Sequence, residues 1–150
     1  MEQRSSYHFE KVEAGHFDDL CLLRHKLWPQ DTQQEHLAEI SALYNEMPYC
    51  AFVCYDGKVP VAFAEVSLRH YVNGCLYRPV AFLEGIFVDP AYQRQSLGLQ
   101  LVELCEAWAR EKDVQELGAD AYLENLSSQQ AHKSWGFQMT EKVVYFRKKL

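Results

Sequence analysis

Hydrophobic and polar positions along this 150-residue chain follow two different periods, which divide it into strands and helices. Period-two alternation, or a short apolar run between turn residues, predicts strands at 7–12, 50–55, 58–70, 80–88, 114–121 and 140–147. Apolar residues three and four positions apart predict helices at 14–28, from 32–35 to Pro48, at 97–112 and at 127–135. The order β-α-α-β-β-β-α-β-α-β predicts an α/β protein in which helices cover a mixed sheet.

Turn and cap residues mark the boundaries of these elements. Thr32-Gln33-Gln34-Glu35 is a capping box that starts the second helix. Asp56-Gly57 is a hairpin signal, and Gly136 stands where a helix commonly ends. Since the chain has no linker, repeat or low-complexity segment, we expect a single domain over residues 1–150.

The net charge and the hydropathy of the chain limit the kinds of molecule that it is expected to bind. With 21 acidic and 15 basic residues the net charge is −6, which argues against a nucleic-acid partner and suits a cationic ligand. The sequence has no apolar run long enough for a membrane span and no apolar segment near Met1 typical of a signal peptide. We therefore expect a cytoplasmic protein with no membrane partner.

The cysteines and histidines do not form a ligand pattern. The chain has an odd number of cysteines without paired spacing, namely Cys21, Cys50, Cys54, Cys75 and Cys105. Such a set predicts buried reduced thiols and no disulfide framework. Because no Cys or His pair completes a zinc site, we expect no metal.

The segment from residue 80 to residue 98 is the strongest candidate for chemistry. Glu84 is the single carboxylate inside the apolar strand 80–88, and a buried carboxylate needs a partner or a function. A short polar loop follows, and then an amphipathic helix, whose N-terminus can receive a phosphate. An anion site beside a lone carboxylate is typical of a transferase.

The polar loop resembles the hallmark of the GNAT acyltransferase superfamily, Gln/Arg-x-x-Gly-x-Gly/Ala. Here it reads Gln93-Arg94-Gln95-Ser96-Leu97-Gly98. Four further stretches, 23–29, 69–74, 82–88 and 136–141, are similar in order and spacing to aminoglycoside 6′-N-acetyltransferases. The resemblance extends from about Leu22 to the C-terminus and implies a GNAT-like acyl-CoA N-acyltransferase fold.

The resemblance implies that acetyl-CoA is the co-substrate. It places the cofactor along strand residues Ile86, Phe87 and Val88. It assigns the pyrophosphate to backbone amides of the loop and helix start, namely Arg94, Gln95, Ser96, Leu97, Gly98 and Leu99. Asn125 would contact the cofactor further along, although an Asn there also suits a helix cap.

The resemblance also implies an aminoglycoside acceptor and its site. It places the aminoglycoside against Trp28, Tyr71, Glu84, Asp120 and Glu141. Carboxylates suit ammonium groups and flat aromatic rings suit sugar faces. Glu84 or Asp120, directly or through a water, would take the proton of the 6′-ammonium before the amine attacks acetyl-CoA in a ternary complex. A main-chain N–H near residues 87–88 would stabilise the oxyanion, and Gly85 marks a candidate bulge.

Two alternatives remain open from the sequence. One is a GNAT enzyme for another amine, such as a polyamine or a protein N-terminus. The other is a non-catalytic acyl-CoA sensor, for which Ser96, in place of the first hallmark glycine, is the only indication. A positive φ at that position would add strain of roughly 1 kcal/mol to a serine.

The last predicted strand bears on assembly. The alternation in Val143-Val144-Tyr145-Phe146 offers two apolar faces, one for the core and one for a subunit contact. Dimers are common in the resembling family, so a homodimer is expected. Antibiotic resistance would follow from the implied activity.

Overall fold

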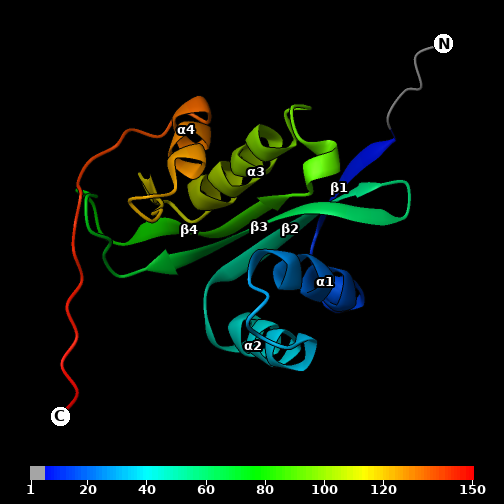
Figure 1. The fold of residues 1–150 in the computed structure, drawn as a ribbon, viewed down its shortest axis with the longest axis horizontal. Helices are drawn as coiled ribbons and strands as arrows, with labels where there is room; N and C mark the ends of the chain where they lie inside the picture. Colours follow the sequence, from blue (N-terminus) through cyan, green and yellow to red (C-terminus); the bar gives the residue numbers. More distant parts are fainter. Residues whose placement is uncertain (1–5) are drawn as a thin grey trace.

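A computed structural model describes residues 6–150, and a twisted five-stranded sheet runs through its centre (Figure 1). The strands are β1 (Tyr7–Lys11), β2 (Tyr49–Asp56), β3 (Val59–Arg69), β4 (Val80–Val88) and β5 (Leu117–Gly118). They lie side by side in chain order. The first four are antiparallel neighbours, and β5 joins β4 in parallel, so the sheet is mixed as the sequence predicts.

Helices cover both faces of the sheet (Figure 1). A 3₁₀ turn, η1 (Ala14–His16), leads into α1 (Phe17–Leu27), which lies on one face with α2 (Gln33–Glu46). On the other face lie α3 (Leu97–Glu111), preceded by the 3₁₀ turn η2 (Pro90–Tyr92), and α4 (Leu126–Ser134). Each face has its own apolar core, centred on Leu20, Leu23 and Ile40 beneath α1 and α2, and on Leu97, Leu101 and Cys105 beneath α3.

The sequence signals at the start of α2 and at the end of α4 act as predicted. Thr32 Oγ1 accepts a hydrogen bond from the Glu35 N–H at 3.1 Å, and Glu35 Oε2 accepts one from the Thr32 N–H at 3.0 Å. Gly136 follows α4 with a φ of 93°, which favours glycine. Both predictions are confirmed.

A β-bulge interrupts the pairing of β3 with β4. Glu65 pairs with Gly85 and the next residue, Val66, pairs with Leu83, so Glu84 is the extra residue on β4. The predicted bulge at Gly85 is therefore confirmed. A bulge turns a side chain away from the regular alternation, and here it redirects a carboxylate.

The edge of β4 that faces β5 is paired over only a short length. In the part of the chain that the structure describes, β4 meets β5 at Ala81 with Leu117 and at Phe82 with Gly118. From Leu83 onward β4 separates from β5. Main-chain groups at this edge are consequently available to an extended ligand.

Two predicted strands differ from the structure. The strand expected at 114–121 is reduced to the two residues of β5. The prediction of a strand at 140–147 is wrong for a single copy of the chain, because residues 137–150 contain no helix or strand. Residues 138–150, called here the C-terminal arm, run outward from the body of the molecule (Figure 1). The reason is physical: alternation favours a strand, but a strand forms only beside another strand.

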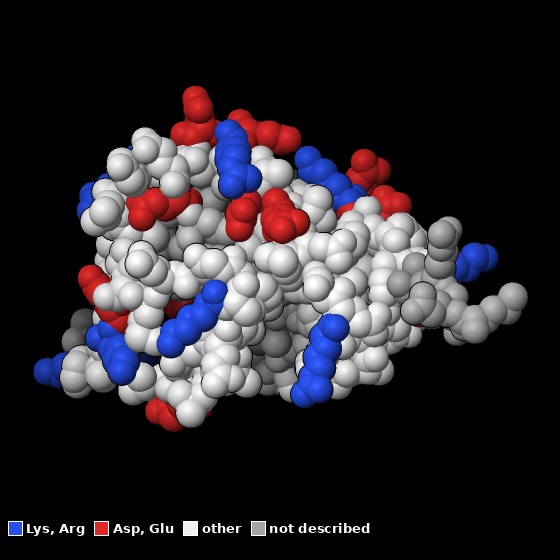
Figure 2. Space-filling model, turned by 90° about the horizontal axis from the view of Figure 1, so that it is seen from above, with Lys and Arg blue, Asp and Glu red and all other residues white. Residues whose placement is uncertain are grey.

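The remaining fold-level expectations concern thiols, membranes and charge. All five cysteines are free and four are buried; burial raises the pKa of the Cys50 and Cys54 thiols to about 11. Among the described residues no helix is both long enough and apolar enough to cross a bilayer. On the face that carries α3 and α4, acidic and basic side chains are interspersed (Figure 2).

Candidate active site

A cavity of about 490 Å³ lies between the loop that joins α1 to α2, helix α2 and the sheet. Its lining combines aromatic, acidic and basic side chains. It consists of Arg24, Trp28, Gln30, Asp31, Glu39, Leu43, Met47, Tyr49, Glu65, Ser67, Arg69 and Glu84. Of the five predicted substrate residues, Trp28 and Glu84 lie in this lining.

Glu84 is held by two neighbours on β3. Its Oε1 accepts hydrogen bonds from Ser67 Oγ at 2.6 Å and from Arg69 Nε at 2.9 Å. Its Oε2 accepts from Arg69 Nη2 at 2.7 Å. Arg69 therefore binds the carboxylate with two nitrogens at once, the strongest geometry available to this ion pair. The bulge makes this contact possible because it turns Glu84 towards the side of β3 that carries Ser67 and Arg69.

Arg69 contacts Glu84 and Phe82, and the charge of Asp120 acts on it from further away. Its guanidinium carbon lies 3.7 Å from the centre of the Phe82 ring. The hydrogen bond to Glu84 raises the pKa of Arg69, burial opposes that rise, and the charges of Glu84 and Asp120 add to it. Asp120 is exposed, just after β5, on the Arg69 side of the site. Of the two predicted proton acceptors, Glu84 thus contacts the guanidinium directly, and Asp120 acts on it through its charge alone.

Trp28 lies against the bulge because Gly85 has no side chain. A Cβ atom at Gly85 would lie 2.5 Å from Trp28 Cη2. The ring therefore packs directly on the backbone next to Glu84. An aromatic surface beside a carboxylate suits a sugar that bears an ammonium group.

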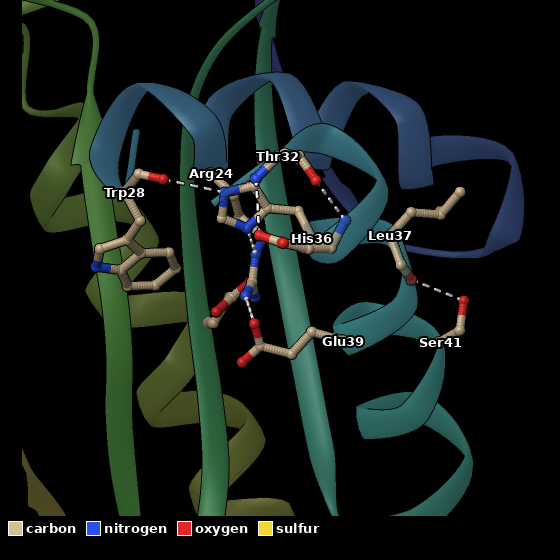
Figure 3. A network of polar contacts seen from close by, with 9 residues as sticks. Arg24, Trp28, Thr32, His36, Leu37, Glu39 and Ser41 are labelled. Atoms are coloured by element: carbon tan, nitrogen blue, oxygen red, sulfur yellow. Dashed lines mark hydrogen bonds and ion pairs between the residues drawn. The ribbon is translucent and has the colours of Figure 1, made fainter. Parts of the chain in front are cut away.

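A second cation, the buried Arg24, lies beside Trp28 (Figure 3). Arg24 forms an ion pair with Glu65, donates to Glu39 Oε2 at 2.7 Å and to His36 Nδ1 at 3.2 Å. His36 Nε2 lies 3.1 Å from the Trp28 carbonyl oxygen, and the Arg24 guanidinium carbon lies 4.9 Å from the Trp28 ring centre. Burial alone lowers the pKa of Arg24, but the charge and hydrogen bond of Glu65 raise it above its usual value.

Sequence reasoning missed this network. Glu65 is a carboxylate in an apolar strand, the same signal that singled out Glu84, and Arg24 stands among the apolar residues of α1. Asp31, His36 and Glu39 place ligand-type atoms within 4.8 Å of one another. However, Arg24 already binds His36 and Glu39, so a guanidinium occupies the place that a metal ion would take.

Asp120 is not among the lining residues of the cavity, and neither are Tyr71 and Glu141. Tyr71 is exposed in the loop after β3, where its hydroxyl donates to Asn73 Oδ1. Glu141 is exposed on the C-terminal arm. Its neighbour Thr140 packs against Gly74 in the same loop that carries Tyr71. In a single chain neither side chain contacts Glu84.

The predicted cofactor residues lie at the end of β4 and in the loop and helix start that follow it. Ile86, Phe87 and Val88 are half-buried at the end of the strand, where β4 has separated from β5. In the loop that follows, Arg94 and Ser96 have φ values of 65° and 61°, in the left-handed region. The second of them is the N-cap of α3 and makes no side-chain cap bond, so unpaired main-chain N–H groups open α3. This geometry suits an anion such as a pyrophosphate.

The other residues predicted to bind the cofactor lie in three settings: the core, the surface and a helix cap. Leu97 and Gly98 are buried, whereas Leu99 and the loop residue Gln95 are exposed. A Cβ atom on Gly98 would lie 2.8 Å from Trp135 Cζ2, so the glycine lets α4 approach α3. Asn125 caps α4, with its Oδ1 accepting from the Ser128 N–H at 3.1 Å. Its capping role is thus observed, and its cofactor contact stays a prediction.

Replacing Ser96 by glycine should stabilise the protein. The serine has a positive φ and no compensating cap bond, so Ser96→Gly is expected to raise the free energy of unfolding by up to about 1 kcal/mol. The affinity for CoA should stay the same or improve. Urea unfolding and calorimetric titration with CoA measure both. Ser41→Gly, inside α2, is the control and should lower stability instead. A large loss of CoA affinity in Ser96→Gly would make the hydroxyl a direct phosphate ligand.

Comparisons with known proteins agree with this geometry. A model of the acetyltransferase (GNAT) family matches residues 17–137. The aminoglycoside N(6′)-acetyltransferase type 1 of Salmonella typhimurium is 37% identical over 140 residues, which are 93% of this chain and 97% of that protein.

Two solved structures share the whole fold. The aminoglycoside N-acetyltransferase AAC(6′)-Iy in complex with CoA is 33% identical with a TM-score of 0.94, over 100% of this chain and 99% of that one. The same enzyme with the bisubstrate analog CoA-S-monomethyl-acetylneamine is 34% identical with a TM-score of 0.92, over 97% and 100% of the two chains. The chain therefore belongs to the GNAT acetyltransferase family, within the group of the aminoglycoside 6′-N-acetyltransferases.

Proposed function

We propose that this chain transfers the acetyl group of acetyl-CoA to the 6′-amine of an aminoglycoside, and that it confers resistance to these antibiotics. The observation that carries the proposal is the position of Glu84. It lies on the bulge of β4, with an aromatic and acidic cavity on one side and the open edge of β4 leading to the α3 N-terminus on the other. The relatives named above carry this activity in their names.

The cofactor half of the site fits acetyl-CoA. The open edge of β4 from Leu83 to Val88 offers main-chain groups to an extended chain, and the left-handed residues Arg94 and Ser96 open the α3 N-terminus towards an anion. Acetyl-CoA supplies an activated thioester. A main-chain N–H near residues 87–88 is the proposed donor to the oxyanion that forms at its carbonyl carbon.

The acceptor half prepares the amine. An ammonium has no lone pair, so it must lose a proton before it can attack the thioester carbonyl. Glu84 or Asp120, directly or through a water, takes that proton, and the Trp28 ring carries the sugar beside it. Held together in a ternary complex, the amine nitrogen bonds to the acetyl carbon and the carbon–sulfur bond breaks, without an acyl-enzyme intermediate. CoA leaves as a thiolate that takes up the second proton of the amine.

A panel of acceptors tests the proposed function. We expect acetyl transfer to a kanamycin-type aminoglycoside with a 6′-amine and none to the matched compound with a 6′-hydroxyl. Equal turnover of both compounds would contradict the regiochemistry. Turnover of spermidine or of a peptide N-terminus alone would assign another amine, and tight CoA binding without any turnover would indicate a sensor.

A homodimer is part of the proposal. The C-terminal arm exposes an alternating apolar run, with Val144 74% and Phe146 93% exposed. Strand β5 is an edge of the sheet, and Tyr122 and Leu123, which follow it, and Leu126, the first residue of α4, are also exposed. An arm with strand-like alternation and an open sheet edge complement one another when supplied by two copies of the chain. If the arm of one copy packs on the sheet edge of the other, it also brings Glu141 to the surface of that other copy.

Charging the arm tests the dimer. The double substitution Val144→Asp with Phe146→Asp should convert a dimer into a monomer, because two carboxylates would enter an apolar contact. Light scattering coupled to gel filtration measures the mass. Lys149→Glu, on the same arm, is the control and should remain dimeric. A wild-type protein that is monomeric at tens of micromolar would contradict the proposal directly.

We further propose that residues 1–150 act as one catalytic domain in the cytoplasm. One sheet carries both halves of the site. Five free cysteines suit a reducing compartment, in which acetyl-CoA is also made.

A further inference from the structure

Glu84 is already occupied by a cation of the protein itself. Both carboxylate oxygens accept hydrogen bonds from Arg69, and Ser67 binds one of them in addition. In this state Oε1 already accepts two hydrogen bonds and Oε2 accepts one, so only a single acceptor position on Oε2 is left for an incoming ammonium. Any acceptor that uses Glu84 must therefore either share it with Arg69 or take the place of Arg69.

Arg69 can move, in contrast to Arg24. Its side chain is 43% exposed and it is the last residue of β3, next to a loop. Arg24 is 2% exposed and is enclosed by Glu65, Glu39 and His36. Of the two guanidiniums in the cavity lining, one is thus fixed in the core and the other can swing into solvent.

The surroundings of Arg69 are those that the reacting ammonium would need. The guanidinium pairs with Glu84, lies over the Phe82 ring and is influenced by the charge of Asp120. A carboxylate and an aromatic face in contact, with the charge of a second carboxylate nearby, are a site for a cation. These two carboxylates are also the proposed proton acceptors.

We propose that Arg69 is a specificity-determining residue that occupies the position of the 6′-ammonium in the free protein and leaves when the acceptor binds. This inference rests on the proposed function. An acceptor with an ammonium at the 6′ position replaces one cation on Glu84 by another, so the carboxylate is never left without a counter-ion. An acceptor with a hydroxyl there cannot make this exchange, and Arg69 stays on Glu84.

The exchange predicts opposite behaviour for two matched ligands. In Arg69→Gln the competing cation is gone, so the Kd of a kanamycin-type compound with a 6′-amine should fall by about fivefold. The Kd of the compound with a 6′-hydroxyl should stay within about twofold, because that compound does not compete with Arg69. Both ligands carry the same other ammonium groups, so a general change in the charge of the protein would shift both equally.

The experiment is calorimetric titration of CoA-bound protein with the two aminoglycosides. Arg69→Met, which keeps an apolar stem over Phe82, is the second variant, and Arg69→Lys should restore wild-type affinity. Arg110→Gln, in an exposed pair on α3, is the control and should change neither Kd. Steady-state kinetics with the 6′-amine should show the same change in KM.

Two outcomes would overturn the inference. If both ligands bind more tightly to Arg69→Gln by the same factor, the effect is one of overall charge. If the 6′-amine binds more weakly, Arg69 holds Glu84 in place and does not compete for it. Binding is measured without turnover, so these outcomes are separate from a failure of the proposed function, which would appear as absence of acetyl transfer by the wild type.

Discussion

Glu84→Gln is expected to lower kcat for acetyl transfer to an aminoglycoside by about 100-fold or more, which is the usual contribution of a positioned general base. The glutamine keeps the shape of the side chain and can still bond with Ser67, but it cannot take a proton. The Kd for CoA should not change, because Glu84 points to the cavity side of β4. Asp120→Asn should show the same separation of turnover from CoA affinity.

The measurement is the pre-steady-state rate of CoA release together with a CoA titration. Glu103→Gln, an exposed glutamate on α3, is the matched control and should retain wild-type kinetics. If Glu84→Gln and Asp120→Asn both keep the wild-type rate across the pH range, neither carboxylate is the proton acceptor. A drop in one variant alone would assign the role to that residue.

Arg24→Met should destabilise the fold by about 3–5 kcal/mol at neutral pH, because it leaves the carboxylate of Glu65 buried and unpaired. Urea unfolding at one protein concentration measures the loss. Arg110→Met, which breaks an exposed pair with Glu106, is the control and should cost less than about 1 kcal/mol. Arg24→Met combined with Glu65→Leu should be more stable than the single variant, since no buried charge remains. A double variant less stable than Arg24→Met would contradict this cause.

The loss in Arg24→Met should depend on pH with a defined sign. Burial raises the pKa of Glu65, and the charge of Arg24 opposes that rise in the native protein. Even with Arg24 in place the folded-state pKa of Glu65 lies above its usual value, and without Arg24 it rises further. The folded protein then binds the proton more tightly than the unfolded chain, so stability is favoured at low pH and is lost as the pH rises through the folded pKa. The difference in unfolding free energy between wild type and Arg24→Met should therefore shrink between pH 7 and pH 5.

Local patterns predicted most of the elements because the information lies within a few residues. The capping box at Thr32, the hairpin at Asp56-Gly57 and the apolar periodicity of α3 each specify their own backbone. The arm shows the limit of such patterns. Its alternation is suited to a strand, yet a strand needs a neighbour, and one copy of the chain provides none there.

The candidate site divides in the same way. Glu84 and the hallmark loop are visible in the sequence because a lone carboxylate in an apolar strand and a turn before an amphipathic helix are local features. Ser67 and Arg69 become partners of Glu84 only through the pairing of β3 with β4 and its bulge. From the sequence we could say only that a positive φ at Ser96 would cause strain. The structure shows that φ is positive there.

The sequence by itself predicted most of the elements in their order, the family, an anion-binding loop and the residue types of an acceptor site for a cation, because each depends on short-range patterns. Only the tertiary structure decided which charges meet. It paired Arg24 with Glu65 in the core and Arg69 with Glu84 at the surface of the cavity, two similar ion pairs with different freedom to move. The physical reason is that burial and pairing depend on contacts between residues far apart in the chain, and those contacts exist only after the sheet has formed and α1 and α2 have packed on it.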